Sequence, residues 1–315
     1  MRERLRILTW HVHGNYLYYL SQIPHDLYLV TKPGYPPGYA GVGGALPWGG
    51  NVHEVPWDAV RDREFDCVLF QHRDHFARDR DALLTPAQRA LPTLFLEHDP
   101  PQGHPTDTLH PVQDRDVLLV HVTPFNALMW DNGVTPACVV EHGVLVDPQV
   151  RYTGALARGI SVVNHLTRRG RRLGADVFAA MRERVPLDLI GMDARAAGGL
   201  GEVPNPEVAA FMSRYRFFFH PIRYTSLGLA VVEAMAIGMP VVGLATTELA
   251  AVIERGQNGY VDTDTDRLAE VMRALLEDPV LAARWGARAA KTARERFGID
   301  RFVADWERVL RGVTA

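Results

Sequence analysis

The amino-acid sequence predicts an α/β fold made of two domains, each built around a parallel sheet. Its 315 residues suffice for two domains of ordinary size, because domain lengths cluster near ~100–150 residues. Short apolar runs alternate with helical patterns along most of the chain, which is typical of βαβ units. Hydrophobic residues make up 47% of the chain and charged residues 23%, so we expect sizeable cores and no global disorder.

The C-terminal half shows the alternation more clearly. Gly238 ends one predicted helix, Pro240 opens the next strand, and Arg255–Gly259 makes a helix end and a turn. The predicted strands are Ile160–Asn164, Leu187–Gly191, Phe217–His220, Val241–Ala245 and Tyr260–Val261. The predicted helices are Ala175–Arg184, Pro206–Arg214, Ser226–Ile237, Glu248–Arg255 and Asp266–Leu276.

The N-terminal half repeats the pattern less regularly. We place the join between the halves near Val146–Pro148, which gives a first domain at 1–147 and a second at 148–298. The last segment, 299–315, is predicted to be an amphipathic helix that packs back on the body. The strands predicted in this half are Leu5–Trp10, Leu27–Thr31, Phe65–Gln71, Thr93–Glu97, Val117–His121 and Ala137–Glu141.

The segment Lys32–Trp57 is rich in glycine and proline and contains the rings Tyr35, Tyr39, Trp48 and Trp57. A structureless segment of this length is uncommon in a compact domain and is often functional. Two interpretations remain open. The segment is either a substrate loop whose aromatic faces stack on sugar, or a surface excursion held in place by its rings.

Charge and cysteine content exclude several classes. The net charge of −3 argues against a nucleic-acid-binding protein, which normally presents a dense basic face. Cys67 and Cys138 lie far apart in apolar runs, as expected for free thiols in a reducing compartment. The N-terminus shows no signal-peptide pattern, and no apolar stretch looks like a membrane span. We therefore expect a cytoplasmic protein whose association with a membrane is at most peripheral.

Glu233 is the only charged residue in the segment 227–245. Burying an ionised carboxylate is costly unless it accepts hydrogen bonds. The vicinal hydroxyls of a ribose are suitable donors, and acidic residues serve this purpose in nucleotide-binding folds. The alternative is a glutamate that points outward or pairs with a buried arginine.

The residues Tyr224–Gly228 follow a predicted strand and open the helix that contains Glu233. Backbone N–H groups and the helix dipole converge at such an end, which makes it suitable for a diphosphate. If the helix starts near Ser226, Glu233 lies roughly 10 Å along its axis. That is about the span from a diphosphate to its ribose.

The segment 220–242, which ends in Glu233-Ala-Met-Ala-Ile-Gly-Met-Pro-Val-Val, resembles the signature of family 4 glycosyltransferases. The family pattern is Pro-Ser-x-x-Glu-Gly-Phe-Gly-x-x-x-x-Glu-Ala-Met-Ala-x-Gly-x-Pro-Val-Val, and the register holds without gaps. The likeness continues through Thr246-Thr-Glu248 and the turn 256–259, and covers most of residues 155–315. It is weaker in the N-terminal half, where 97–99 and 140–147 occupy comparable places.

The resemblance implies a GT-B fold, in which two Rossmann-like domains face each other across a cleft. It implies a UDP- or GDP-type nucleotide-sugar donor on the C-terminal domain, an acceptor mainly on the N-terminal one, a hexosyl transfer with retention of configuration, and no metal or further cofactor. Glu233 matches the family's ribose contact. The phosphate side of the donor falls on Ser226, Leu227 and Gly228.

Two departures from the family pattern affect the site. The first glutamate of the Glu-x7-Glu motif, which approaches the donor sugar, falls on Thr225. The phosphate-binding Arg and Lys fall on Arg168 and Leu173, so that Arg172 or its neighbour Arg171 would supply the second cation. The alternative is a solvated basic turn.

Two further positions complete the predicted site. Gly14, in the turn His13-Gly-Asn15, could close on the phosphate from the N-terminal domain. His98 matches a position where related enzymes place an active-site histidine near the sugar; the alternative is a structural histidine bonded to a loop carbonyl. In a retaining mechanism in which the acceptor attacks from the same face as the leaving group departs, charge develops on the leaving diphosphate. The diphosphate itself takes the acceptor's proton, so no catalytic base is required.

The histidine pairs His11/His13 and His72/His75 have no companions at zinc-like spacing, so a metal site is not predicted. The function we predict is a retaining glycosyltransferase that acts in surface polysaccharide or glycoconjugate synthesis. Its acceptor would be a glycan, a lipid-linked sugar or a small molecule, and it would bind no nucleic acid. The alternatives are a non-catalytic sugar-nucleotide-binding partner protein and a nucleotide-sugar epimerase on the same fold.

Overall fold

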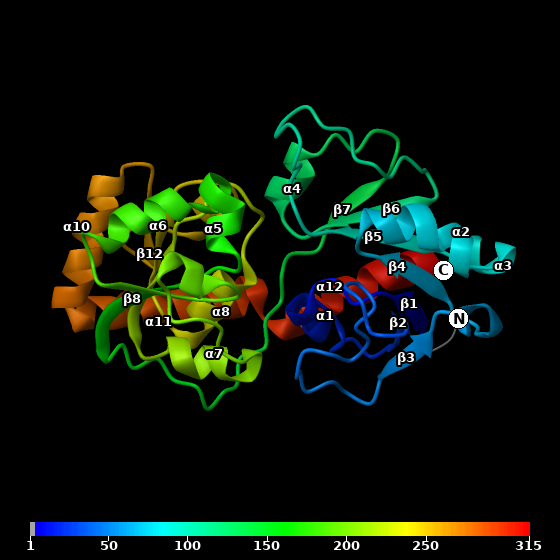
Figure 1. The fold of residues 1–315 in the computed structure, drawn as a ribbon, viewed down its shortest axis with the longest axis horizontal. Helices are drawn as coiled ribbons and strands as arrows, with labels where there is room; N and C mark the ends of the chain where they lie inside the picture. The colour runs from blue at the N-terminus through cyan, green and yellow to red at the C-terminus, as the bar shows by residue number, and fades with distance from the viewer. Residues whose placement is uncertain (1–3) are drawn as a thin grey trace. The chain divides into compact units, whose positions relative to one another are not determined.

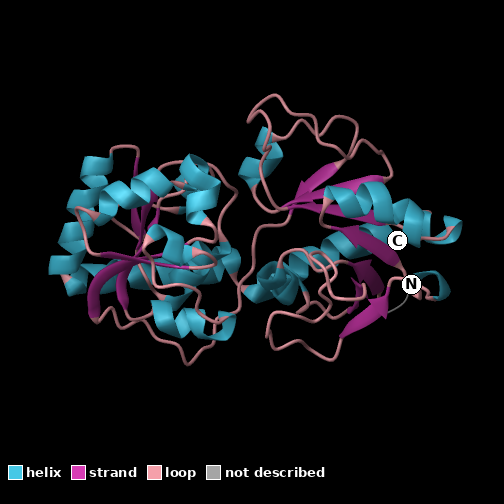
Figure 2. Cartoon of the chain, in the orientation of Figure 1, coloured by secondary structure: helices cyan, strands magenta, loops and turns pink. Residues whose placement is uncertain are grey.

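The computed structural model describes residues 4–315, which form two compact units. The N-terminal unit contains the residues up to Gly143 together with 299–315, and the C-terminal unit contains 144–298. Each unit is a parallel sheet with helices between its strands, as Figures 1 and 2 show. The predicted α/β class with two parallel sheets is confirmed.

The N-terminal unit is built on a seven-stranded sheet in the order β3-β2-β1-β4-β5-β6-β7. Each pair of neighbouring strands in this order is parallel. The strands are β1 (Arg6–Thr9), β2 (Asp26–Thr31), β3 (Val52–Pro56), β4 (Cys67–Phe70), β5 (Thr93–Glu97), β6 (Val117–His121) and β7 (Ala137–Val139). The helices are α1 (Gly14–Leu20), α2 (Arg80–Leu83), α3 (Pro86–Arg89), α4 (Pro124–Met129) and α12 (Ile299–Thr314), with a 3-10 turn at Val60–Asp62 and a π-helical turn at His75–Asp79.

The last helix, α12, returns to the N-terminal unit and buries its apolar side there. Phe302, Trp306 and Leu310 are at most 1% exposed. The indole Nε1 of Trp306 lies 3.3 Å from the hydroxyl oxygen of Tyr16 on α1, and the ring of Phe302 packs edge-on against the same tyrosine. Gly143 lies directly beneath Phe302, where a Cβ atom would overlap that side chain.

Two elements of this unit differ from the expectation. The segment Lys32–Trp57 is not structureless throughout, because its end forms the edge strand β3. The polar residues of β3 and the flanking glycines hide the strand in the sequence. It lies at the edge of the sheet and pairs with β2. The predicted turn around Gly14 is the start of a helix, α1, which has no side-chain cap.

The C-terminal unit is built on a five-stranded parallel sheet in the order β12-β11-β10-β8-β9. The strands are β8 (Leu156–Val162), β9 (Leu187–Ile190), β10 (Tyr215–His220), β11 (Val241–Leu244) and β12 (Gly259–Asp262). The helices are α5 (Leu166–Arg169), α6 (Ala175–Arg182), α7 (Asn205–Met212), α8 (Leu229–Ile237), α9 (Leu249–Val252), α10 (Thr265–Glu277) and α11 (Pro279–Phe297), with 3-10 turns at Gly170–Leu173 and Ala194–Ala197.

The core of this unit packs α6 and α10 on one side of the sheet, through residues such as Phe178 and Met272, which are 1% and 0% exposed. Helix α8 is apolar nearly all round, and six of its nine residues are buried. A helix of this kind is an interior element, and α8 packs against α11. Gly238 adopts φ 100° at the end of α8, which confirms the predicted glycine stop.

Helix α8 begins later than predicted. Its first residue is Leu229 and Gly228 is the N-cap, so Ser226 and Leu227 lie in an irregular segment before it. The predicted helix Glu248–Arg255 is only the single turn α9, because the backbone leaves the helical region at Ile253.

Both cysteines are free, as predicted; Cys67 is buried and Cys138 is half-buried. Over residues 4–315, no helix combines the length and the apolar character needed to cross a bilayer.

Candidate functional site

Each sheet has one topological switch point, where the chain leaves neighbouring strands in opposite directions. In the C-terminal unit this point lies between β8 and β10, and in the N-terminal unit it lies between β1 and β4. Ligands of open α/β sheets bind outside the carboxyl ends of the strands at such points. A ligand site is therefore expected in the segments that follow these strands.

In the C-terminal unit, the segments after β8 and β10 are bonded to each other. The carbonyl oxygen of Arg172 accepts hydrogen bonds from the backbone N–H groups of Arg223 and Tyr224, at 3.0 and 3.2 Å. Gly174 backs onto Pro221 so closely that a Cβ atom would overlap its carbonyl oxygen. The structure thus brings the predicted basic segment 168–172 beside the predicted phosphate segment 225–228.

The arginines of this region divide into paired and unpaired ones. Asp176, in the first turn of α6, accepts from both Arg223 and Arg171. The side chains of Arg168 and Arg172 have no hydrogen-bond or ion-pair partner within residues 4–315; Arg168 is exposed and Arg172 is half-buried.

The charge of Arg172 lies near the hydroxyl group of Tyr224, where it opposes the rise that burial causes in the pKa of that tyrosine. Leu173 is 1% exposed and belongs to the hydrophobic core. Its place in the family pattern therefore offers no phosphate contact.

Two threonines that follow β11 hydrogen-bond to the backbone of the segment before α8. The hydroxyl groups of Thr246 and Thr247 donate to the carbonyl oxygens of Ile222 and Ser226, at 3.0 and 3.4 Å. Thr247 has φ 52°, a conformation that a β-branched residue rarely adopts and that is common at functional sites. Thr225 lies in the same segment and is half-buried.

Glu233 lies four residues into α8, about 6 Å along the axis from Leu229 at the usual rise. This is shorter than the ~10 Å expected, because the helix starts three residues later. The side chain is 9% exposed, so its carboxylate belongs to the interior of the unit. The first turn of α8 above it, Leu229–Ala230, is half-buried.

In the N-terminal unit, three segments that follow strands meet at the switch point. Gln71 follows β4, His98 follows β5, and His13 precedes Gly14 at the start of α1. The Oε1 atom of Gln71 lies 3.1 Å from Nε2 of His98. The His98 ring centroid lies 4.2 Å from that of His13 and 4.8 Å from that of Tyr16. Burial, with smaller effects of His13 and His142, lowers the pKa of His98 well below its usual value.

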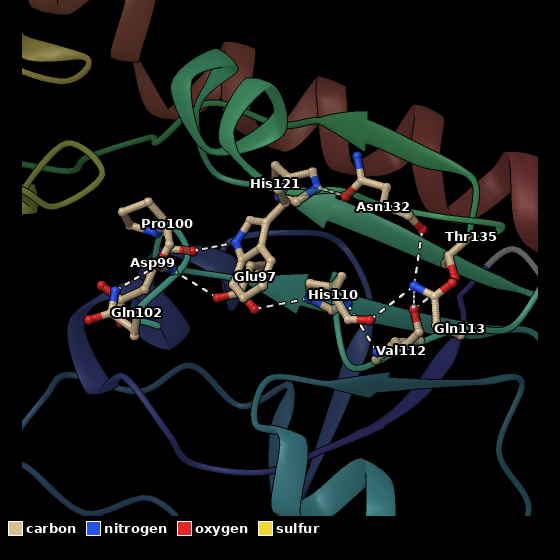
Figure 3. A network of polar contacts seen from close by, with 11 residues as sticks. Glu97, Asp99, Pro100, Gln102, His110, Val112, Gln113, His121, Asn132 and Thr135 are labelled. Atoms are coloured by element: carbon tan, nitrogen blue, oxygen red, sulfur yellow. Dashed lines mark hydrogen bonds and ion pairs between the residues drawn. The ribbon is translucent and has the colours of Figure 1, made fainter. Parts of the chain in front are cut away.

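The residues on both sides of His98, Glu97 and Asp99, belong to a polar network that Figure 3 shows. Glu97 accepts from Nε2 of His110 at 3.1 Å and from the backbone N–H of Asp99 at 2.9 Å. The indole Nε1 of Trp130 donates to the carbonyl oxygen of Asp99 at 2.8 Å. The network anchors both sides of His98 and leaves its ring free of those bonds.

The segment Lys32–Trp57 lies beside the start of α1. The hydroxyl group of Tyr39 donates to Asp79 at 2.6 Å, and the amine of Lys32 lies 3.8 Å from the Tyr39 ring centroid. Trp48 packs edge-on against His11, whose Nδ1 lies 2.6 Å from the carbonyl oxygen of Gly41. Two of the four rings therefore hold the segment in place.

The other two rings of the segment, Tyr35 and Trp57, are 57% and 42% exposed. They are available to a ligand, so both interpretations of the segment remain.

The histidine pairs take other roles. His11 contacts Gly41, and His75 stacks on Trp10 with ring centroids 5.4 Å apart. Across residues 4–315, no three histidine, cysteine, aspartate or glutamate side chains are grouped as a metal would require.

Two residues of the site are not among those predicted from the sequence. Arg223 occupies an unspecified position of the family pattern and is identified only by its pairing with Asp176. Gln71 ends a predicted strand, and a polar residue at that place is a weak hint of a site at the carboxyl edge. Gly14 and His98 lie in the N-terminal unit, whereas the other predicted site residues lie in the C-terminal one.

Comparison with known proteins agrees with the C-terminal geometry. Residues 198–292 match the family model Glycosyl transferases group 1. The chain is 34% identical over 115 residues to D-inositol 3-phosphate glycosyltransferase 1 of Catenulispora acidiphila, a match that covers 35% of this chain and 27% of that protein. It is 27% identical over 202 residues to the lipopolysaccharide core biosynthesis mannosyltransferase LpcC of Rhizobium leguminosarum, with 53% and 57% covered. The chain thus spans about a quarter to a half of the length of these curated relatives.

Solved structures match over nearly the whole chain. Sucrose-phosphate synthase from Thermosynechococcus elongatus superposes with a TM-score of 0.71 at 14% identity, covering 98% of this chain and 99% of that one. Anabaena HepE, in complex with UDP and glucose, superposes with a TM-score of 0.68 at 14% identity, covering 98% and 100%. The chain therefore has the GT-B fold, and its C-terminal unit contains the region that matches the Glycosyl transferases group 1 family.

Proposed function

We propose that the protein is a glycosyltransferase that uses a nucleotide-diphosphate sugar and binds the donor nucleotide on its C-terminal unit. The observation that carries the proposal is the buried carboxylate of Glu233 in the apolar helix α8, behind the segment that follows β10 at the switch point. This helix lies within the part of the chain that matches the glycosyltransferase family model.

Different residues of the C-terminal unit would bind the ribose, the diphosphate and the sugar of the donor. We assign Glu233 to the ribose, whose hydroxyl groups donate hydrogen bonds to its carboxylate. The diphosphate lies at the backbone N–H groups of Ser226, Leu227 and Gly228, just before the start of α8. Arg172 supplies a cation, because its guanidinium has no partner within residues 4–315, and Arg168 can supply a second. Thr225 contacts the donor sugar.

This arrangement suits departure of a diphosphate. Negative charge grows on the leaving phosphate as the glycosidic bond breaks, and donors fixed in advance stabilise that charge without reorganising. The segment 221–228 is fixed in this sense, because Thr246, Thr247 and Arg172 bond its backbone. We propose transfer with retention of configuration, in which the leaving phosphate takes the proton of the acceptor hydroxyl, without a metal ion.

We assign the acceptor to the N-terminal unit. The side chains suited to sugar hydroxyls there are His98 at the switch point and the exposed rings of Tyr35 and Trp57. Gly14 stays a proposed phosphate contact on the ground of the family resemblance. LpcC is a mannosyltransferase of lipopolysaccharide core synthesis and HepE was solved with UDP, so we propose a UDP or GDP hexose as donor and a glycan or glycoconjugate as acceptor.

One observation favours a second candidate, a sugar-nucleotide-binding partner protein without turnover. Thr225 stands where the family pattern has a carboxylate near the donor sugar. A hydroxyl group can still hydrogen-bond to the sugar but brings no negative charge. Nucleotide binding without product would identify this candidate.

Release of nucleoside diphosphate tests the proposal. UDP-glucose, GDP-mannose and ADP-glucose are each incubated with the wild type, with Glu233→Gln and with Asp188→Asn. Asp188 is half-buried near the start of β9, away from the carboxyl edge, and accepts from Arg158 at 2.6 Å. Its variant therefore controls for the loss of a carboxylate in this unit.

We expect one donor to be turned over by the wild type and by Asp188→Asn, with a loss of tenfold or more in Glu233→Gln. Turnover that is equal in all three proteins would place the nucleotide elsewhere.

A further inference from the structure

Gln71 is 4% exposed, and its buried side-chain amide makes three hydrogen bonds within the protein. Its nitrogen donates to the hydroxyl of Thr9 at 3.0 Å and to the carbonyl oxygen of Trp10 at 3.1 Å. Its oxygen faces Nε2 of His98 at 3.1 Å. A carbonyl oxygen can only accept, so the group that faces Trp10 must be the NH₂ group, and this determines which way the amide points.

The orientation of Gln71 determines the proton position on His98. An amide oxygen can only accept, so Nε2 of His98 must carry a hydrogen to bond with it. A neutral imidazole has one ring hydrogen, and Nδ1 is then an acceptor with a free lone pair. His98 is neutral near pH 7 because burial holds its pKa well below the usual value.

The groups that face His98 do not favour a positive charge. The ring contacts are with His13 and Tyr16, and His142 is near enough to lower the pKa further. The neighbouring carboxylate of Glu97 accepts from His110 and from the backbone of Asp99.

Two other buried histidines of this unit lie beside carboxylates instead. His110 lies 3.1 Å from Glu97, and His25 lies 2.5 Å from Glu307. A carboxylate would stabilise an imidazolium, whereas the amide of Gln71 orients the ring without stabilising one.

We propose that Gln71 is a positioning residue that holds His98 in the Nε2–H tautomer, so that Nδ1 accepts a hydrogen bond from a hydroxyl group of the sugar substrates. The role in catalysis rests on the proposed function, whereas the tautomer is a property of the free protein. An imidazolium, or the opposite tautomer, has no lone pair at Nδ1 and could only donate a hydrogen bond to such a hydroxyl group.

Nitrogen-15 NMR of the full-length protein, labelled at histidine and without ligand, reads the tautomer directly. We expect protonated Nε2 and bare Nδ1 for His98 at pH 7. His110 is an internal reference for the same tautomer, because its Nδ1 accepts from the backbone N–H of Val112. A bare Nε2 on His98, or an imidazolium at pH 7, would overturn the proposal.

Two variants separate positioning from folding. Gln71→Met keeps the side-chain length and removes the bond, so His98 should show a mixture of tautomers while His110 does not change. Gln71→Glu replaces the amide with a carboxylate, which should raise the pKa of His98 in the same spectra. Spectra of His98 that stay as in the wild type in both variants would contradict the assignment.

Gln88→Met is the matched control. Gln88 is 6% exposed, donates to the carbonyl oxygens of Val60 and Arg63 and accepts from the backbone N–H of Thr85. Gln88→Met therefore loses the same number of bonds as Gln71→Met, and none of them involves His98, Gln71 or the rings that contact His98.

Hydrolysis of UDP-glucose, GDP-mannose and ADP-glucose provides the second readout. We expect Gln71→Met to turn over the active donor roughly tenfold more slowly than Gln88→Met, as for one lost hydrogen bond to substrate. Equal rates would overturn the catalytic role. If the wild type hydrolyses none of the three, the proposed function fails, and the spectra still decide the tautomer.

Discussion

Arg223 and Asp176 form a bidentate ion pair that joins the segment after β10 to the first turn of α6. The guanidinium nitrogens lie 2.5 and 2.8 Å from the two carboxylate oxygens. The same arginine donates to the carbonyl oxygen of Arg171 at 2.8 Å. Its charge is therefore used to hold the proposed phosphate segment in place. In the segment 168–172, Arg168 and Arg172 are the arginines without a side-chain partner among residues 4–315, and Arg172 is the one next to the Arg223 contact.

The ion pair predicts a pH dependence of stability. Bonding to Arg223 lowers the pKa of Asp176 from 3.8 to about 2. A carboxyl group whose pKa is lower in the folded state stabilises the fold above its unfolded pKa, and this contribution is lost as the pH falls toward the folded value. The side chain is 38% exposed, so the contribution is only about 1 kcal/mol or less.

Urea unfolding of wild type and Asp176→Asn between pH 7 and pH 2.5 measures this contribution. We expect the wild type to be the more stable protein at pH 7, with a difference that narrows below pH 4. A difference that stays constant over this range would show that the carboxylate charge of Asp176 does not matter.

Arg172 is predicted to bind the diphosphate. A charge-assisted hydrogen bond is worth about 1.5–3 kcal/mol, so Arg172→Ala should weaken nucleoside diphosphate binding by roughly tenfold to a hundredfold. Arg171→Ala is the matched control, because Arg171 is exposed and bonded to Asp176. Isothermal titration with UDP and GDP compares the two; an equal loss in both variants would mean that the effect is one of general charge.

Thr225 is predicted to act on the sugar and not on the nucleotide. Thr225→Ala should leave the affinity for the nucleoside diphosphate within about twofold, since the backbone N–H groups of the segment remain, and should slow turnover of the donor by about tenfold. Titration and rate measurements on the same preparation provide the two numbers. A variant as active as the wild type would remove Thr225 from the site.

Gly143 is predicted to be required for the docking of α12. A Cβ atom there would overlap the side chain of Phe302, which is 0% exposed, so Gly143→Ala should cost about 1–3 kcal/mol of stability. Gly312→Ala in the same helix is the control, since no atom lies within 4 Å of its Cβ position and alanine favours a helix by about 1 kcal/mol. Thermal unfolding should show opposite shifts, and a neutral Gly143→Ala would mean that α12 packs differently.

The fold was largely predictable from the sequence because its strands are short apolar runs. The strands β8 to β12 match the predicted ones to within a few residues, and Gly238 stops α8 as expected. Strand β3 was missed, because an edge strand needs no apolar run and its residues include His53 and Glu54.

The site was predictable only in part. Glu233 stands out as a lone charge in an apolar helix, and the family resemblance assigns the segment before it. The predicted start of α8 near Ser226 is too early, since the backbone enters the helix only after Gly228. The pairs Arg223–Asp176 and Gln71–His98 join residues far apart in the chain, so no local pattern could indicate them.

A thermal-shift panel of UDP, GDP, ADP and CMP on wild type and Glu233→Ala tests the central claim most directly. A ligand that binds only the folded state stabilises it by ~2.7 kcal/mol at a hundredfold excess over its dissociation constant, which is readily visible. We predict that one nucleoside diphosphate raises the melting temperature of the wild type and that Glu233→Ala loses this shift. The absence of a shift with every nucleotide, or an equal shift in both proteins, would contradict a donor site at Glu233.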